Sequence, residues 1–311
     1  MDVALKVDVD THQGLGEGVP RLMRALADLG VTATFLIAMG PDNAGRAIVR
    51  VFKNPGFLKK MRRTGAVSMY GLRTVLSGTV LPARPIALAF PSVMRDLARA
   101  GFEVGVHGYD HVRWQDRLDE IGADGIRGEI EEAFEAFRAV MGEPSRCFAA
   151  PGWRTSAAAL RTLDTIGLDY RSDTRGVAPY LCEIAGETFA TPEIPTTLPT
   201  LDEVMGPELA DSGAIVRFYL DRMKAGALNV HTIHAETEGA GQIDTFVALI
   251  RALKDRGARF VQLREAAAAL DRAALPTCEV VRSTLPGRAG WISAQGPERA
   301  TEASHAAAAG L

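Results

Sequence analysis

The sequence predicts an α/β fold with a mostly parallel β-sheet, either open or closed into a barrel. Apolar, strand-like runs alternate with helical patterns along most of the chain. The second of these runs, residues 31–39 (VTATFLIAM), is apolar nearly throughout, as expected for a strand buried on both faces. The 311 residues are 47% hydrophobic and 23% charged, which is ample for such a core. We expect one domain over residues 1–295 and a flexible tail over 296–311.

The expected elements follow one another as strand and helix in turn. Strands are expected at residues 3–9, 31–39, 102–107, 146–150, 168–172, 228–234 and 258–263. Helices are expected at residues 17–29, 92–101, 124–141, 156–166, 209–225, 242–256 and from Arg264 onward. Pro20 in the first turn of the first helix and Gly30 just past its end mark its two bounds.

Cysteine content and hydropathy indicate a cytoplasmic protein. The three cysteines are widely spaced and form no Cys-x-x-Cys motif, which argues against a disulfide framework or a cysteine-based zinc site. The first strand is expected from about Val3, which leaves no room for a signal peptide. The sequence also contains no run of about 18 uncharged apolar residues, so we expect no membrane-spanning helix.

Ionisable residues gather where the predicted strands end. Asp8 and Asp10 end the first strand on one face, because successive strand side chains point to opposite faces. His107 ends the third strand and His234 ends the strand at 228–234, while Asp173 and Arg175 follow the strand at 168–172. Ligands of parallel α/β folds bind at the carboxyl ends of the strands. The sequence therefore predicts an active site at this rim.

The motif HGYDH supplies two histidines four residues apart that can converge on one metal ion. His107 and His111 with one carboxylate form a set that suits zinc, iron, cobalt or manganese. The His-x-x-x-His spacing alone fits a structural or exposed pair equally well, but the neighbouring aspartate pair favours the metal. A divalent cation would also make the two like charges of Asp8 and Asp10 favourable. We expect Asp10 to bind the ion and Asp8 to act as general base on a water that the ion activates.

A separate general acid is expected at His234. Asp173, from a neighbouring strand, would favour the charged form of this histidine. A metal, a base and a separate acid together indicate hydrolysis of an amide or ester.

Other residues near the rim have two interpretations each. Trp153 is either core or the wall of a sugar pocket, and Arg154 either begins a helix or binds substrate. Glu236 either contacts the sugar and the new ammonium or is a solvated charge. We expect His12 to lie in the loop after the first strand and His231 to pack on the opposite strand face from His234.

An apolar strand followed by Asp-x-Asp also begins the haloacid-dehalogenase phosphatases. That motif normally has Thr or Val two residues after the second aspartate, where this chain has His12. The later GDxxxD pair that completes their magnesium site is also missing from the sequence. We therefore do not interpret this sequence as a phosphatase of that kind.

The order of the motifs resembles that of the polysaccharide deacetylase (NodB-homology) superfamily, carbohydrate esterase family four. The matching motifs are VDVD, HGYDH, AAPGW, SDTRG and TIH. The resemblance implies a distorted (β/α) barrel and one divalent metal ion (Zn, Mn, Co or Ni). It also implies the roles assigned above: Asp8 as base, Asp10, His107 and His111 as metal ligands, His234 as acid and Asp173 tuning that acid.

One position departs from the superfamily pattern. The third motif normally begins with an arginine that pairs with the catalytic aspartate, and this chain has Ala149 there. Arg154 or Arg175 would then supply the cation. We favour Arg175, because it follows Asp173 by two residues at the same strand end.

Longer stretches resemble the deformylase branch of that superfamily over almost the whole chain. They are DVDTHQGLGEGVPRL, MGPDNAGR, HGYDHVRWQ, AAPGWR, YRSDTRG, IPTTLPTLDEVMG, TIHAETEG and VVRSTLPGRAGW. The resemblance implies removal of the N-formyl group from formamido-arabinose linked to undecaprenyl phosphate, a step in the aminoarabinose modification of lipid A and in polymyxin resistance. A deacetylase of an N-acetylated sugar or polysaccharide and a non-catalytic membrane-bound module are the alternatives.

The net charge of −3 conceals a strongly basic segment. Residues 43–95 contain ten basic and no acidic residues, whereas the rest of the chain has 25 basic against 38 acidic residues. Apolar and cationic side chains mix in residues 49–63, as in segments that lie at a membrane surface. Each cation there contributes about 1 kcal/mol near an anionic bilayer. We expect a membrane-facing insertion that uses Lys53, Phe57, Lys59, Lys60, Arg62 and Arg63.

The expected localisation is therefore the inner face of the inner membrane, with peripheral attachment to its anionic surface. A solvated, basic helical hairpin that covers the barrel is the alternative. No nucleic-acid-binding motif accompanies the charge, so nucleic acid is not expected as a partner. The sequence indicates no protein partner.

Overall fold

The computed structural model describes residues 1–46, 82–206, 209, 211–286, 288 and 290–299. Its centre is a parallel sheet in the order β10-β1-β2-β5-β6-β7, and β11 also pairs with β1. The strands are β1 (Asp2–Val9), β2 (Thr34–Ile37), β5 (Glu103–Val106), β6 (Cys147–Phe148), β7 (Tyr170–Arg171), β10 (Leu228–His234) and β11 (Arg259–Val261). Every pair in this sheet is parallel, which confirms the predicted α/β class.

The sheet curls into a distorted barrel, as the resemblance implies. Residues 192–198 run in an extended path beside β7, where Arg171 forms a parallel bridge with Glu193. Farther along, Thr197 N donates to Val230 O of β10 at 3.1 Å. This segment thus links the two edge strands of the sheet order, which do not pair with each other.

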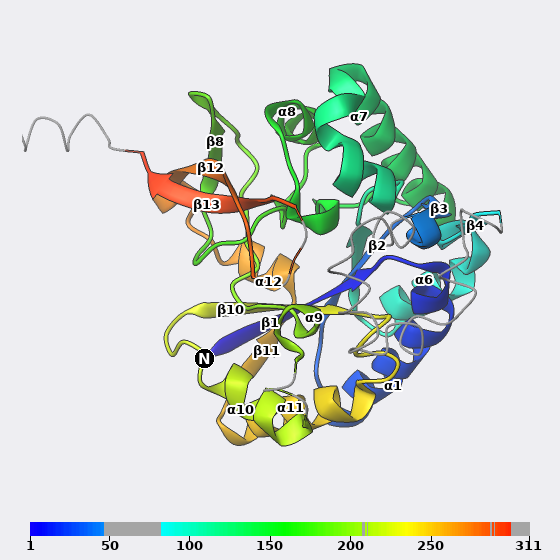
Figure 1. Cartoon of the computed structure of the whole chain (residues 1–311), viewed down its shortest axis with the longest axis vertical. Helices are drawn as coiled ribbons and strands as arrows, with labels where there is room; N and C mark the ends of the chain where they lie inside the picture. The colour runs from blue at the N-terminus through cyan, green and yellow to red at the C-terminus, as the bar shows by residue number, and fades with distance from the viewer. Residues whose placement is uncertain (47–81, 207–208, 210, 287, 289, 300–311) are drawn as a thin grey trace, which may run out of the picture.

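Helices cover the outside of the curled sheet (Figure 1). They are α1 (Val19–Leu29), α6 (Pro91–Arg99), α7 (His111–Met141), α8 (Ala157–Ile166), α9 (Leu201–Val204), α10 (Ser212–Leu220), α11 (Ile243–Asp255) and α12 (Leu263–Ala268). A π-helical turn, η1 (Gly14–Gly18), leads into α1, which ends at Gly30 in the left-handed region with φ 61°. The helix expected at 124–141 is the second half of α7, because Gly122 interrupts the helical backbone with φ 73° and ψ 166°.

Successive side chains of β1 point to opposite faces of the sheet, one set to the outer core and the other to the barrel interior. Val3, Leu5, Val7 and Val9 belong to the large apolar cluster, which also contains residues of α1, α7 and α11. Ala4 belongs to a second cluster with residues of β2, β6, β7 and β10. Lys6 and Asp8 share the strand face of Ala4 and therefore face the barrel interior.

A second, four-stranded sheet was not predicted. It consists of β13 (Ile292–Glu298), β12 (Thr277–Ser283), β8 (Leu181–Ile184) and β9 (Glu187–Thr188), in that order. Residues 296–298, expected in the flexible tail, are the end of β13, because Glu298 pairs with Cys278 of β12. The sheet packs against α8 through Leu160, Tyr180, Cys182 and Phe189.

A short two-stranded sheet pairs β3 (Pro41–Asp42), just before the basic segment, with β4 (Arg84–Pro85), near the end of that segment. The 3-10 turn η2 (Ala87–Ala89) and α6 follow β4. The expected membrane-facing residues Lys53, Phe57, Lys59, Lys60, Arg62 and Arg63 lie outside the described residues. Among the helices that the structure describes, none is both long and apolar enough to cross a bilayer.

Candidate active site

The three expected metal ligands come together at the carboxyl end of the sheet. Asp10 follows β1, His107 follows β5, and His111 is the first residue of α7; one ligand atom from each lies within 4.8 Å of the others. His107 Nε2 is 3.4 Å from Asp10 Oδ1, and His111 Nε2 is 3.4 Å from Asp10 Oδ2. Asp10 Oδ1 is buried and has no hydrogen-bond partner. A cation at this point would satisfy it, so the residues fit a divalent metal.

The HGYDH loop fixes the two imidazoles. Gly108 has φ 73°, and a Cβ there would lie 2.7 Å from Pro151 Cγ, so the turn requires glycine. Asp110 caps α7 by accepting a hydrogen bond from Arg113 N, which places His111 in the first turn. His107 Nδ1 lies 3.0 Å from Ala149 O, which leaves Nε2 for the metal.

Burial sets the protonation of the ligands. It lowers the pKa of His107 well below its usual range and lowers the pKa of His111 to about 4, so both rings are neutral, as metal ligands must be. Burial also raises the pKa of Asp10 to about 6, opposed by the positive charge of His234 and reinforced by the negative charge of Asp8. A divalent ion would favour the charged carboxylate.

Glu236, which follows β10 in the chain, supports the loop after β1 that carries Asp10. Its Oε1 accepts hydrogen bonds from Asp10 N at 2.9 Å, from Thr11 N at 2.8 Å and from Thr11 Oγ1 at 2.8 Å. The side chain is buried, and a Cβ on Gly14 would lie 1.9 Å from Oε1. Glu236 is therefore not a solvated charge, because its Oε1 holds the backbone at residues 10 and 11. Its Oε2 is buried without a hydrogen-bond partner, and the contact with the sugar or the new ammonium stays a prediction.

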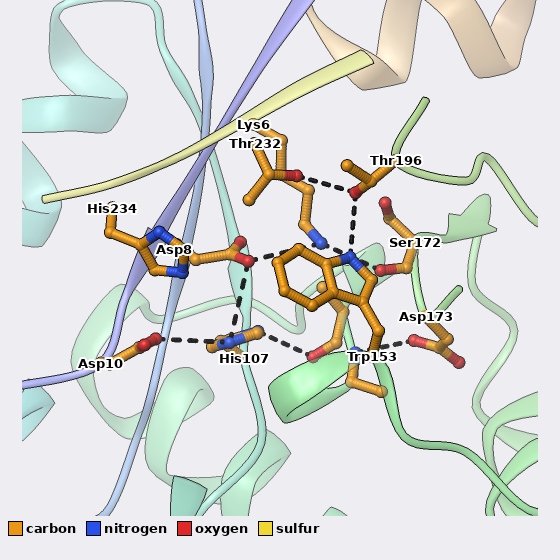
Figure 2. Close-up of polar contacts among 12 residues, drawn as sticks. Lys6, Asp8, Asp10, His107, Trp153, Ser172, Asp173, Thr196, Thr232 and His234 are labelled. Atoms are coloured by element: carbon orange, nitrogen blue, oxygen red, sulfur yellow. Dashed lines mark hydrogen bonds and ion pairs between the residues drawn. The ribbon is translucent and has the colours of Figure 1, made fainter. Parts of the chain in front are cut away.

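The cation beside Asp8 is Lys6, a residue that the sequence-based assignment missed. Lys6 Nζ lies 3.4 Å from Asp8 Oδ2 and donates to Ser172 O at 3.1 Å (Figure 2). The two side chains are 0% and 3% exposed. Asp8 Oδ2 is also 3.9 Å from His107 Nε2, which puts the expected base beside the metal ligands. The available signal was the spacing of two, which puts Lys6 and Asp8 on one strand face.

The expectation that Arg175 or Arg154 replaces the missing arginine is wrong. Arg175 Nη1 donates to both carboxylate oxygens of Glu203, at 2.9 and 3.1 Å, and its Nη2 donates to Leu198 O. Arg154 donates to Trp291 O at 2.9 Å and to Gln115 O, and its guanidinium stacks on the Trp291 ring. The side chains of both arginines are engaged by other protein groups, whereas Lys6 lies beside Asp8 on the same strand.

His234 lies beside the expected base. Asp8 and His234 are register partners in the parallel pair of β1 and β10, so their side chains share the inner face of the barrel. Burial alone would lower the pKa of His234, but the carboxylates of Asp10, Asp202 and Asp8 raise it to about 9. The ring is therefore protonated at neutral pH, as a general acid must be.

The carboxylate that pairs with His234 is Asp202, not Asp173. Asp202 Oδ1 is 4.0 Å from His234 Nδ1. Asp173 accepts from Ala150 N at 2.8 Å, and in Figure 2 it lies across the Trp153 ring from His234. Burial and the nearby Glu193 raise the pKa of Asp173 well above its usual range. The loop at 192–200 and the short helix α9 bring Asp202 to the site, a placement that strand order alone does not predict.

Trp153 lies between the active site and the protein interior. It is 2% exposed, donates from Nε1 to Thr196 Oγ1 at 3.0 Å, and its ring is 6.4 Å from that of His234. Its backbone has φ 53°, a strained conformation for a tryptophan. The ring is nearly buried, as expected for a core residue, and its role as the wall of a sugar pocket stays a prediction.

Of the two remaining histidines near the rim, His231 lies where it was expected, whereas His12 belongs to the helical turn that leads into η1 rather than to a loop. His12 Nδ1 lies 2.8 Å from Pro85 O, and the ring packs on Phe90. His231 is buried, with its ring 4.4 Å from that of Tyr219. It is the register partner of Leu5, so it faces the outer core rather than the site.

Comparison with known proteins agrees with this fold. Residues 2–171 match the family model of polysaccharide deacetylases, described as "Polysaccharide deacetylase". The fold and the site define a metal-dependent type of hydrolase, and the chain belongs to the polysaccharide deacetylase family.

Two curated relatives are more specific. The chain is 34% identical, over 94% of each sequence, to a probable 4-deoxy-4-formamido-L-arabinose-phosphoundecaprenol deformylase of Shewanella sediminis (strain HAW-EB3). It is 31% identical to a probable deformylase of the same description from Wigglesworthia glossinidia brevipalpis, over 89% of this chain and 96% of the relative.

Solved structures share the fold at lower identity. A putative polysaccharide deacetylase from Mycobacterium smegmatis matches with a TM-score of 0.63 and 20% identity, over 91% of this chain and 94% of that one. A structure described as "T48 deacetylase with substrate" matches with a TM-score of 0.53 and 17% identity, over 87% and 92% of the two chains.

Proposed function

We propose that this protein is a metal-dependent deformylase that removes the N-formyl group from 4-deoxy-4-formamido-L-arabinose linked to undecaprenyl phosphate. The observation that carries the proposal is the 34% identity to a probable deformylase of that substrate over 94% of both chains. A complete set of base, acid and candidate metal ligands at one strand rim supports it.

Each role in the reaction falls to a residue of known position. Asp10, His107 and His111 would hold one divalent ion, which supplies Lewis-acid polarisation of the formyl oxygen and acidifies water. Asp8 takes a proton from the attacking water, and Lys6 holds that carboxylate in place.

His234 completes the reaction on the leaving group. Its raised pKa keeps the imidazole protonated at neutral pH, so it can donate a proton to the departing sugar amine. Asp202 helps to keep the ring charged and oriented. The products are formate and an aminosugar that stays attached to its lipid.

The experiment is an assay of formate release from the formamido-sugar lipid and of acetate release from its acetamido analogue, with metal analysis of the purified protein. We expect the formyl substrate to be preferred. Asp8→Asn should abolish turnover and leave the metal content nearly intact, whereas Asp10→Asn should lose both. Preference for the acetyl substrate would favour the alternative of a sugar deacetylase, and full activity of Asp8→Asn would refute the assigned base.

We also propose that a single domain carries an insertion within the basic segment at about residues 43–95, and that this insertion faces the anionic inner surface of the inner membrane. The lipid-linked substrate of the relatives and the eight basic residues between β3 and β4 support the proposal, whereas Arg95 belongs to α6 and donates to Val140 O. In this setting the protein would serve the aminoarabinose modification of lipid A and polymyxin resistance. Changing Lys59, Lys60, Arg62 and Arg63 to glutamate should abolish flotation with anionic liposomes. The control variant Arg21→Glu/Arg24→Glu, on the exposed face of α1, should still float; unchanged flotation of the first variant would refute the proposal.

A further inference from the structure

Arg175, Glu203 and Arg288 form a cluster of charged side chains beside His234, in which two guanidinium groups share one carboxylate. The Glu203 carboxylate binds Arg175 through both oxygens, at 2.9 and 3.1 Å. Arg288 Nη1 approaches the same carboxylate at 3.7 Å, farther than a hydrogen bond allows. The neighbouring Asp202 faces the imidazole of His234. The counter-charge nearest to Arg288 is therefore already engaged by Arg175.

Arg288 borders the active site, although the proposed mechanism gives it no role. Its guanidinium carbon is 4.6 Å from the centre of the Trp153 ring, which in turn adjoins the imidazole of His234. The positive charge of Arg288 is felt at the metal ligands, where it opposes the burial that raises the pKa of Asp10. The side chain is 14% exposed, compared with 5% for Glu203. It is therefore a partly exposed cation stacked on a rigid aromatic ring at the rim of the site.

The substrate named for the deformylase relatives carries an anion as well as the formamide. Its formamide is on the fourth carbon of arabinose, and a phosphate stands between the sugar and undecaprenol. A phosphate joined at the anomeric carbon would lie on the opposite side of the sugar ring from the formamide. When the formamide is held at the metal ligands, the phosphate lies one ring's breadth away. A guanidinium placed over an indole can still use its planar N–H fork to bind phosphate oxygens, which match that fork in geometry.

We propose that Arg288 binds the phosphate of the lipid-linked glycosyl phosphate and so selects phosphate-bearing substrates. The inference rests on the proposed deformylase function and adds a residue that recognises the end of the sugar remote from the reaction. Arg175 and Glu203 act as positioning residues. The hydrogen bonds from Arg175 fix the Glu203 carboxylate, which Arg288 approaches at 3.7 Å. The loop between β12 and β13 supplies Arg288, so the second sheet takes part in substrate recognition.

The test compares two formamido sugars in the metal-loaded enzyme, one linked to a short prenyl phosphate and one a methyl glycoside without phosphate. Arg288→Gln should lower kcat/KM for the phosphate-bearing sugar by roughly 10- to 100-fold, the value of a hydrogen bond to a charged group. The same variant should lower kcat/KM for the methyl glycoside far less, and this remaining activity also shows that it has folded. Arg288→Lys should lie between the two, because lysine keeps the charge and loses the fork.

Arg282→Gln is the matched control. Arg282 lies on the same hairpin, pairs with Asp119 and is 61% exposed, so its removal should affect neither substrate. Equal loss on both substrates in Arg288→Gln would indicate a structural role and overturn the proposal, as would no loss on the phosphate-bearing sugar. If the wild-type enzyme released formate from neither sugar, the proposed function itself would fail.

Discussion

Replacing Lys6 with methionine removes the buried cation beside Asp8 while roughly keeping the length of the side chain. The two charges are 3.4 Å apart, so at an effective dielectric constant of about 20 they attract each other by about 5 kcal/mol. Removing one partner of a buried pair typically costs about 3–5 kcal/mol, because the other charge stays buried without compensation. We therefore expect Lys6→Met to lose about 3–5 kcal/mol of unfolding free energy, measured by urea denaturation of the metal-free protein.

The double variant Lys6→Met/Asp8→Asn distinguishes the cost of an unpaired buried charge from the cost of altered packing. It leaves no unpaired charge, so it should be more stable than Lys6→Met alone. Lys224→Met, on the exposed surface, should change stability by no more than about 0.5 kcal/mol. In the metal-loaded enzyme, Lys6→Met should also lower kcat by roughly 100-fold or more, because the general base loses its support. A loss below about 1 kcal/mol in Lys6→Met, or strict additivity in the double variant, would refute the reasoning.

Three further predictions concern other charged groups of the site and the core. Asp202→Asn should move the alkaline limb of the kcat–pH profile to lower pH, because Asp202 is one of the carboxylates that raise the pKa of His234 to about 9; an unmoved limb would contradict the pairing. Glu236→Ala should weaken zinc binding by roughly 10- to 100-fold in calorimetric titrations, since the metal-ligand loop loses its hydrogen-bond acceptor, while the exposed Glu131→Ala should bind as the wild type does. Burial lowers the pKa of His231 to about 3, so the unfolded state binds more protons below pH 6.5 and this histidine costs stability as the pH falls. Between pH 7 and pH 5, His231→Phe should therefore lose about 2 kcal/mol less unfolding free energy than the wild type, and equal losses would contradict the assignment.

The parallel sheet could be predicted because local patterns determine it. A strand buried on both faces is apolar throughout, and the helices between strands show their own period and their own end signals, such as Gly30. The second sheet lacked such a signal. β12 carries charged residues between its apolar ones, and it pairs with β8, which lies about a hundred residues earlier in the chain. Strand pairing at that separation depends on how the rest of the chain folds.

The sequence by itself determined the metal-ligand set. Parallel strands end at one edge of the sheet, so Asp10 and His107 meet there, and the four-residue spacing of the HGYDH motif brings His111 to the same point. Alternation along β1 likewise placed Asp8 on the inner face.

Only the tertiary structure decided which charges pair inside that rim. Lys6 rather than an arginine meets Asp8, and Asp202 rather than Asp173 meets His234. Alternation along a strand determines which face of the sheet a side chain lies on. An ion pair also requires two charged atoms within about 4 Å of each other, and that distance depends on the curl of the sheet and the path of the loops. The segment at 192–202 and the hairpin of the second sheet follow paths set by packing, and they bring Asp202 and Arg288 to the site.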